Sequence, residues 1–279
     1  MEACTITQPL VAGWLKTRNP FSHKGDYGRA SLIVGSVGMI GAALLSARAC
    51  LRSGVGLLTV HVPECGYSIL QAGVPEAKCQ ADEHYTHHTY IELPLWTEAV
   101  GIGPGIGLHT QTEWALHRLM LLNPTIPMVL DADALNILAV NQHWLPLIPK
   151  GSIITPHPGE LKRLGADPAE LAAQYQLVVV LKGHHTRIYV PQGGSVQVYE
   201  NTLHGNAGMA VGGSGDVLTG IILALMAQHY TADQAAVIGV WIHALAADLA
   251  LADGNSEESL LPSDIISHLG AAFNASRQS

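Results

Sequence analysis

Charged side chains are scarce in this sequence. Asp, Glu, Lys and Arg make up 13% of the 279 residues, against about a quarter in a typical globular protein, so much of the surface is expected to be small or uncharged. The formal net charge of −8 disfavours a nucleic-acid or anionic-membrane surface, although a local basic pocket for phosphate remains compatible with it. Hydrophobic residues, at 48%, are ample for a large buried core.

Signals of several other protein classes are also missing. The four cysteines show no CxxC pair and no metal-ligand spacing, so we expect small buried hydrophobes in a reducing compartment. The first residues, MEACTITQPL, lack a basic segment followed by an apolar one, and no secretory signal is expected. The apolar stretch 235–251 is short for a membrane span and contains His243 and Asp248. We therefore expect a soluble, cytoplasmic protein.

Short β-branched runs alternate with Ala- and Leu-rich helical runs. Apolar strands that alternate with helices predict a buried, mainly parallel sheet covered by helices on both faces. Gly193-Gly194 within 186–200 predicts a hairpin turn. We predict one α/β domain over 1–279, with an irregular N-terminal arm over 1–25 and two long apolar helices closing the chain. The expected strands lie within 31–36, 56–63, 99–107, 127–138, 151–164 and 177–183.

Distinctive loops follow these strands. Ligands of such sheets bind beyond the carboxyl ends of the strands, so the loops are expected to converge on one edge. Neither glycine-rich loop has the GxGxxG spacing, and no Gly-Lys-Ser/Thr occurs, so a Rossmann fingerprint and a P-loop are both disfavoured. Tight strand-to-helix turns remain an alternative role for these glycines. The loop sequences are GSVG, GIGPGIG, DADALN, TPHPGE and KGHHT.

The segment GGSGD (212–216) precedes an unbroken apolar run. Successive amides that open a helix form a concave set of donors, and the helix dipole adds positive potential, which suits a phosphate group. Asp216 would repel that phosphate unless its carboxylate serves the reaction as the base that accepts a hydroxyl proton. The alternative is a plain N-cap. The residues alone leave both roles open.

Other polar loops carry weaker signals. His157 lies between two prolines that fix the backbone around its ring. Lys182 and Thr186 surround a glycine turn that suits phosphate or adenine, or that is simply the solvated start of a hairpin. Asp131 and Asp133 either hold a divalent ion through water or cap the next helix, and capping is the favoured role for one of them. The cluster HYTHH (84–88) could be a metal site, but it has no acidic or cysteine partner in register and is interpreted as a surface loop.

The motifs resemble, in order, those of the stand-alone ADP-dependent NAD(P)H-hydrate dehydratase family. The resemblance implies a ribokinase-like fold and a lyase that restores NADH or NADPH from the hydrates NADHX and NADPHX. ADP would phosphorylate the substrate hydroxyl, and loss of phosphate would leave the reduced cofactor and AMP. The matching segments, from about residue 24 to the end, are GDYGRASLIVGS, the Gly41-Ala42 step, GIGPGIG, LDADALN, TPHPGE, LKGHHT and GNAGMAVGGSGDVLTGI.

The resemblance also implies roles for single residues. Ala42, Gly105, His157 and Asp216 would bind the hydrated nucleotide, and Asp216 would be the catalytic base. It further implies Mg²⁺, a cytoplasmic homotetramer, and a separate epimerase for the other hydrate stereoisomer. Where the family commonly reads GNPGMATGGTGD, this chain has Ala207, Val211 and Ser214. The residues that would hold ADP or AMP are Lys182, Gly183, His184, His185, Thr186, Gly212, Gly213, Ser214 and Gly215.

Two other functions stay open. An ATP-dependent kinase of a small alcohol, such as a vitamin precursor, would use the same fold, although TPHPGE and KGHHT favour the dehydratase. A non-catalytic nucleotide sensor would keep the glycine cradle, but an intact Asp216 disfavours it, since a sensor gains nothing from a carboxylate beside bound phosphate.

Overall fold

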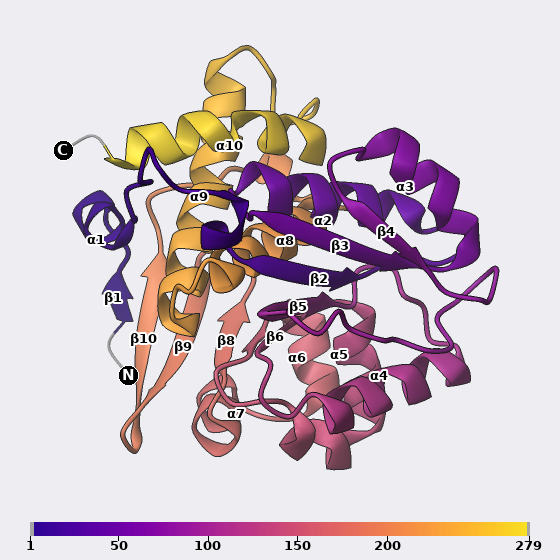
Figure 1. Ribbon diagram of the computed structural model, residues 1–279. Helices are drawn as coiled ribbons and strands as arrows, with labels where there is room; N and C mark the ends of the chain where they lie inside the picture. Colours follow the sequence, from indigo (N-terminus) through magenta and orange to yellow (C-terminus); the bar gives the residue numbers. More distant parts are fainter. Residues whose placement is uncertain (1–2, 278–279) are drawn as a thin grey trace.

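The apolar runs form one ten-stranded sheet in the computed structural model, which describes residues 3–277 (Figure 1). The strand order is β1-β10-β9-β8-β7-β6-β5-β2-β3-β4. The central strands are apolar on both faces because helices cover both. The strands are β1 (Ala3–Thr5), β2 (Arg29–Ile33), β3 (Leu57–Val62), β4 (Lys78–Ala81), β5 (Ala99–Ile102), β6 (Met128–Leu130), β7 (Ile153–Ile154), β8 (Val178–Leu181), β9 (Thr186–Gln192) and β10 (Ser195–Asn201).

Pairing in the sheet is parallel except around one hairpin. Strand β9 runs antiparallel to β8 and to β10, and the other pairs between described strands are parallel. Gly193 and Gly194 form the hairpin turn with φ values of 52° and 97°, the positive pair that a tight two-residue turn requires. The mainly parallel sheet and the hairpin confirm the sequence prediction.

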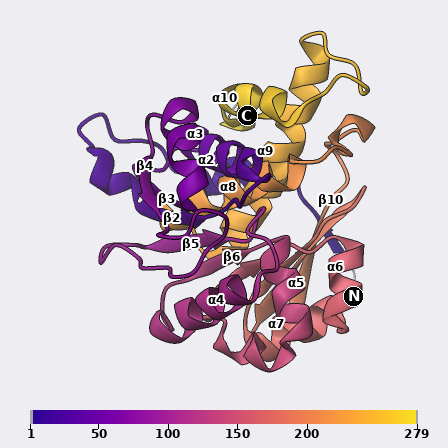
Figure 2. The same ribbon diagram turned by 90° about the vertical axis from the view of Figure 1, so that its right-hand side faces the viewer.

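Helices form a layer on each face of the sheet, which the two ribbon views show from perpendicular directions (Figure 1, Figure 2). On one face lie α1 (Gln8–Trp14), α2 (Ile40–Arg52), α3 (Tyr67–Gly73), α8 (Ser214–Ala227), α9 (Ala232–Ala252) and α10 (Pro262–Arg277). On the other lie α4 (Thr110–Leu122), α5 (Asp133–Val140), α6 (Pro158–Leu164) and α7 (Pro168–Tyr175).

Successive side chains of the central strands enter different cores. In β8, Val178 and Val180 belong to the core under α2, α8 and α9, whereas Val179 belongs to the core under α4 to α7. The pleat of a strand produces this alternation, because neighbouring side chains point to opposite faces. A strand with both faces covered is therefore apolar at every position.

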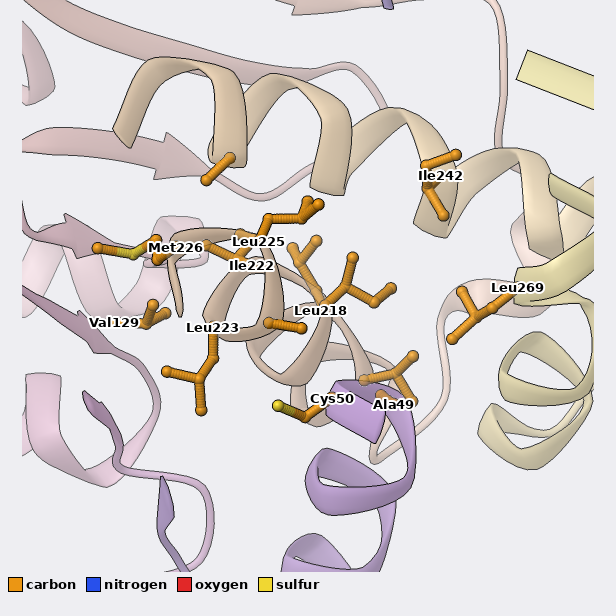
Figure 3. Packing of buried hydrophobic residues seen from close by; sticks show 14 of the residues in the cluster. Ala49, Cys50, Val129, Leu218, Ile222, Leu223, Leu225, Met226, Ile242 and Leu269 are labelled. Atoms are coloured by element: carbon orange, nitrogen blue, oxygen red, sulfur yellow. The ribbon is translucent and has the colours of Figure 1, made fainter. Parts of the chain in front are cut away.

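Helix α8 is apolar around its circumference and is buried between the sheet, α2 and α9 (Figure 3). Gly220 allows α2 to approach, since a Cβ there would lie 2.2 Å from the Ser46 carbonyl oxygen. Leu223 is fully buried, and truncating such a side chain to alanine costs about 2–5 kcal/mol. This packing fixes the N-terminus of α8, which carries Asp216.

Parts of the sequence prediction need correction. The arm over 1–25 is not irregular throughout, because β1 and α1 form within it; residues 1–2 lie outside the described part. A further helix, α10, follows the two that were expected to close the chain. Helix α9 is long and apolar enough to cross a membrane, but 72% of its apolar window is buried inside the protein. Of the cysteines expected to be buried, Cys50 is buried and Cys4 is exposed.

Candidate active site

Loops that follow β6, β7 and β8 meet the N-terminus of α8 around a cavity of about 730 Å³. The loops leave the carboxyl ends of parallel strands, the edge where open α/β sheets bind ligands. The segment 204–211 and helix α9 complete the lining. Of the residues singled out from the sequence, those that line the cavity are Asp131, His157, Lys182, Gly183, His184, Thr186, Ala207, Val211, Ser214, Gly215 and Asp216.

A buried ion pair lies in the wall of this cavity. Lys182 Nζ is 2.6 Å from Asp131 Oδ1, and the Thr219 hydroxyl donates to Asp131 Oδ2 at 2.8 Å. Burial alone would lower the pKa of Lys182, but the carboxylates of Asp131 and Glu160 outweigh it and raise that pKa. Lys182 therefore keeps its positive charge, which an anionic ligand in the cavity would meet.

The loop after β6 does not have the role favoured from the sequence. The N-cap of α5 is Ala132, which makes no side-chain cap bond, and Asp131 pairs with Lys182 instead. Asp133 Oδ2 accepts the Gly107 N–H at 2.9 Å. Ala132 has a φ of 48° and a ψ of −117°, a positive-φ conformation that costs a non-glycine residue about 1–3 kcal/mol and that occurs frequently at functional sites. The capping interpretation of Asp131 and Asp133 is wrong.

His157 begins α6 and closes a capping box. Its Nδ1 accepts the N–H groups of Gly159 and Glu160, while the Glu160 carboxylate accepts the His157 N–H at 2.8 Å. Because Nδ1 is already used as an acceptor, Nε2 is the ring nitrogen that remains for another partner. It lies 3.4 Å from Glu160 Oε1. Glu160 itself was missed, although the spacing His-Pro-Gly-Glu is a recognisable capping signature.

Asp216 lies in the first turn of α8. Gly213 is the N-cap, with a φ of 97°, and the helix begins at Ser214, so the alternative that Asp216 is the N-cap is wrong. Burial raises the pKa of Asp216 to about 6, and the nearby Asp131 carboxylate adds to the shift. A carboxylate of this pKa is mostly ionised at neutral pH and is basic enough to accept a proton, as a general base must.

The glycines before α8 serve different purposes. A Cβ on Gly213 would lie 2.6 Å from Leu45 Cδ1, so this glycine serves packing and the turn. A Cβ on Gly215 would lie 3.3 Å from Lys182 Nζ, so this glycine keeps space open beside the ammonium. N–H groups of a first turn lack partners within their helix, and the dipole favours anions there. Gly212 is not among the lining residues.

The segment after β8 brings the loop KGHHT to the cavity. Lys182 is 21% exposed and ion-paired. The alternative interpretation, in which this lysine belongs to the solvated start of a hairpin, is therefore wrong. The Thr186 hydroxyl donates to the Gly183 carbonyl at 3.2 Å and holds the turn. The rings of His184 and His185 stack with centroids 4.6 Å apart, and of the two only His184 lines the cavity. A role for His185 stays a prediction.

Ala42 and Gly105 lie next to each other, outside the lining of this cavity. A Cβ on Gly105 would lie 3.2 Å from the Ala42 Cβ and 3.0 Å from the Met39 Cβ. The loops GSVG and GIGPGIG therefore pack on one another, tied by the Gly35 N–H to the Pro104 carbonyl at 2.9 Å. Their part in binding the hydrate stays a prediction.

His204 and the role of Asp248 were missed from the sequence, although the segment from Gly205 on was part of the resemblance. Asp248 of α9 accepts hydrogen bonds from the Gly205 N–H and the Asn206 side chain, and it pairs with His204 Nδ1, all at 3.0 Å. These contacts fix one wall of the cavity to a core helix. Asp248, a charge in an apolar helix, was the available signal, but its partners lie over 40 residues away in the chain.

The cluster HYTHH is not a surface loop throughout. His87 and His88 are buried, and His88 meets His61 and Asp82, whose ligand atoms all lie within 4.8 Å of one another. Asp82 is the acidic partner that the sequence interpretation overlooked.

A second cavity, of about 1030 Å³, lies between the N-terminal segment and α10. Lys16 in its wall already donates to the Gln228 and His229 carbonyls at 3.0 and 2.8 Å. This cation caps the C-terminus of α8. The chemistry of the fold is concentrated at the smaller cavity, where carboxylates and an ammonium are buried together.

The sheet, its helices and the carboxyl-edge cavity define a ribokinase-like α/β protein. A ribokinase-like superfamily protein (EF1790) from Enterococcus faecalis V583 has a TM-score of 0.83 and 26% identity, with coverage of 99% of this chain and 97% of that one. A family model described as NAD(P)H-hydrate dehydratase matches residues 30–270. The chain belongs to this family.

Individual relatives agree with this assignment. The ADP-dependent (S)-NAD(P)H-hydrate dehydratase of Listeria monocytogenes is 30% identical over 95% of this chain and 94% of its own length. The crystal structure of the ADP/ATP-dependent NAD(P)H-hydrate dehydratase from Bacillus subtilis, co-crystallised with ATP/Mg²⁺, has a TM-score of 0.83, 30% identity and 99% coverage of both chains.

Longer relatives match over part of their length. The bifunctional NAD(P)H-hydrate repair enzyme Nnr of Vibrio cholerae is 39% identical over 97% of this chain, which corresponds to 54% of that protein. The chain thus spans about half the length of the first curated relatives it matches.

Proposed function

We propose that this protein dehydrates the hydrated nicotinamide nucleotides NADHX and NADPHX to NADH and NADPH, consuming ADP. The observation that carries the proposal is Asp216, a buried carboxylate with a pKa of about 6. It shares a cavity with the ammonium of Lys182, at the N-terminus of a helix. Membership of the NAD(P)H-hydrate dehydratase family supports this substrate class.

Each group of the cavity has a part in the proposed reaction. Asp216 accepts the proton of the substrate hydroxyl. The hydroxyl oxygen attacks the β-phosphorus of ADP, and AMP departs. The first-turn N–H groups of α8 and Lys182 stabilise the charge on the phosphoryl oxygens. The bond between the ring carbon and the oxygen of the new phosphate ester then breaks, so that inorganic phosphate departs. A proton is lost from the adjacent ring carbon.

The charges of the cavity fit a divalent cation. The carboxylates of Asp131, Glu160 and Asp216 share the one ammonium of Lys182. Burial raises the pKa of Glu160, which Lys182 only partly offsets. Mg²⁺ prefers oxygen ligands and keeps several waters, so Asp131 and Glu160 would hold it through its hydration shell. When bound, Mg²⁺ would neutralise charge on the transferring phosphoryl group.

The remaining parts of the site are assigned to the two ligands. Lys182, Gly183, His184, His185 and Thr186 would face ADP, together with the segment 212–215. His157 would meet the hydrate from the rim of the cavity, and Ala42 and Gly105 would contact it from the neighbouring loops. We further propose a cytoplasmic homotetramer that acts in the same pathway as an epimerase for the other hydrate stereoisomer.

The decisive experiment mixes the protein with hydrated NADH and either ADP or ATP. Recovery of reduced nicotinamide absorbance is followed, together with AMP and phosphate. Faster recovery with ADP, with AMP and phosphate formed in step, is expected. A stable phosphorylated alcohol formed from ATP on a separate small-alcohol panel, with no NADH recovered, would establish a kinase instead.

A further inference from the structure

A buried cluster of two histidines and one aspartate lies outside the proposed active site. His61 comes from the end of β3, whereas Asp82 and His88 come from the segment after β4. The Nδ1 atoms of the two rings are 3.0 Å apart. All three side chains are at most 5% exposed. Two imidazoles and a carboxylate therefore converge at a point that solvent scarcely reaches.

The ring of His88 is oriented as a metal ligand is. Its Nε2 lies 2.9 Å from the Gly35 carbonyl oxygen; a carbonyl only accepts, so this nitrogen carries the hydrogen. Its Nδ1 then presents a lone pair to His61. Metal-bound histidines are neutral and anchor their other nitrogen in this way.

The carboxylate of Asp82 is fixed in place by hydrogen bonds. It accepts hydrogen bonds from the N–H groups of His84, Thr89 and Tyr90 and from the Thr89 hydroxyl, at 2.6–3.1 Å. The cluster thus places a fixed carboxylate beside two imidazole nitrogens, with all three ligand atoms within 4.8 Å of one another.

We propose that His61, Asp82 and His88 bind a divalent transition-metal ion such as zinc. Two nitrogens on one tetrahedral zinc ion are separated by about 3.3 Å, since each Zn–N bond is about 2.0–2.1 Å. The observed separation of 3.0 Å needs the two rings to part by only a few tenths of an ångström. The ion takes the place of the single proton that the facing nitrogens share. Imidazole and carboxylate ligands suit zinc, cobalt and nickel.

The ion would tie together loops at this end of the carboxyl edge. His88 holds the Gly35 carbonyl, the Gly35 N–H holds the Pro104 carbonyl, and the Val37 N–H donates to the Thr86 carbonyl at 2.9 Å. These contacts join the loop GSVG and the loop GIGPGIG to the histidine segment. The metal therefore has a structural role, and the inference stands whether or not the proposed reaction is correct.

A second group of histidines lies near the cluster in the same segment. His84 and His109 are exposed, and their rings pack against the buried His87, with centroid distances of 3.9 and 3.7 Å. Exposed histidines are the groups that would bind metal adventitiously. This makes them the matched control.

The test is a titration of chelator-treated, full-length protein with Co²⁺, followed by the visible absorption of the metal. One equivalent should saturate a tetrahedral spectrum, zinc should displace it, and zinc should raise the Tm by several degrees. His61→Gln should weaken binding by about tenfold or more, whereas the double variant His84→Gln/His109→Gln should bind as the wild type does.

Two results would overturn the proposal. One is a wild-type protein that shows no saturable tetrahedral Co²⁺ spectrum, a result that needs no variant to fold. The other is binding that survives in His61→Gln and disappears in the double variant, which would place the metal on the surface histidines only.

Discussion

Two parts of the carboxyl edge of the sheet, the Lys182 side and the Gly105 side, are held together by different interactions. On the Lys182 side, carboxylates and an ammonium are buried around a cavity, and the pKa of Asp216 is raised to about 6. On the Gly105 side, glycines and Ala42 bring two loops into contact without charge. Changes on the first side should therefore act through charge and pH, and changes on the second through steric fit.

The largest effect is expected for Lys182→Met. It leaves Asp131, which is 1% exposed, without its partner, and an uncompensated buried charge costs about 3–5 kcal/mol. Urea denaturation measures the loss. The exposed Lys162→Met is the control and should stay within about 0.5 kcal/mol of wild type. If Lys182→Met behaved like its control, Asp131 would have to be solvated or protonated, and the contrast between the two sides would fail.

The next largest effect is expected on turnover for Asp216→Asn. An amide cannot accept the hydroxyl proton, so kcat should fall at least ~10²-fold. ADP binding should persist, because a negative charge near the phosphates is removed. Asp167→Asn is a matched control: Asp167 is a true N-cap of α7, and Asn caps equally well. Turnover of Asp216→Asn within a few-fold of wild type would exclude Asp216 as the base.

The pH dependence sharpens the same contrast. Asp216 must be ionised to act, so kcat/KM should fall about tenfold per unit below its pKa of about 6 and level off above it. The contribution of Asp216 to the stability of the fold changes with pH in the opposite direction. Because the folded pKa exceeds the unfolded value of 3.8, the contribution of Asp216 to stability is lost as the pH rises from about 4 to about 6. Asp216→Asn should remove both effects, and a flat profile across this range would contradict the assignment.

A smaller effect is expected for Gly215→Val. The added side chain would enter the space beside Lys182 Nζ, which a Cβ alone approaches to 3.3 Å. ADP affinity should fall by about tenfold, equivalent to 1.4 kcal/mol, as calorimetry would measure. Gly270→Val, at an α10 position with nothing within 4 Å of a Cβ, controls for valine in a helix. Unchanged ADP affinity in a folded Gly215→Val protein would remove this loop from the phosphate site.

The smallest effect is expected for Gly105→Ala, which should raise the KM for the hydrate a few-fold and leave ADP affinity unchanged. Gly105 has a φ of 64° and Gly107 one of 75°, so alanine costs about 1–2 kcal/mol of backbone strain at either position. Near Gly107 a Cβ would meet only the Ser36 hydroxyl, at 3.6 Å. Gly107→Ala is therefore the matched control, and equal KM values for the two variants would show that the contact with Ala42 is irrelevant to the hydrate.

Local sequence signals predicted the sheet well and its edges poorly. Strands such as β8 are apolar on both faces, and the turn Gly193-Gly194 specifies its hairpin, so both were found. Strand β1 was missed because it has three residues, two of them exposed, and forms only by pairing with β10. Helix α10 was missed because it has no continuous apolar run like those of α8 and α9; its buried apolar residues, such as Ile265, Leu269 and Ala272, are separated by polar ones along the sequence.

The site could be predicted only where its chemistry is local. Asp216 stands out in the sequence because it follows a glycine cluster. The partnership of Asp131 with Lys182 joins positions 51 residues apart, and no local pattern reveals it. The metal cluster was missed for the same reason, because His61 reaches His88 only through the pairing of β3 and β4.

The parallel pairing of β1 with β10 has a consequence for biosynthesis. Ala3 is paired with Val198, so β1 must wait for roughly 200 more residues after it is made, which at 5–20 residues per second takes about 10–40 s. During that time its backbone groups have no strand to bind, and the Ile6 side chain, fully buried in the finished protein, is exposed. The edge of the sheet is thus closed by a strand that is made long before its partner.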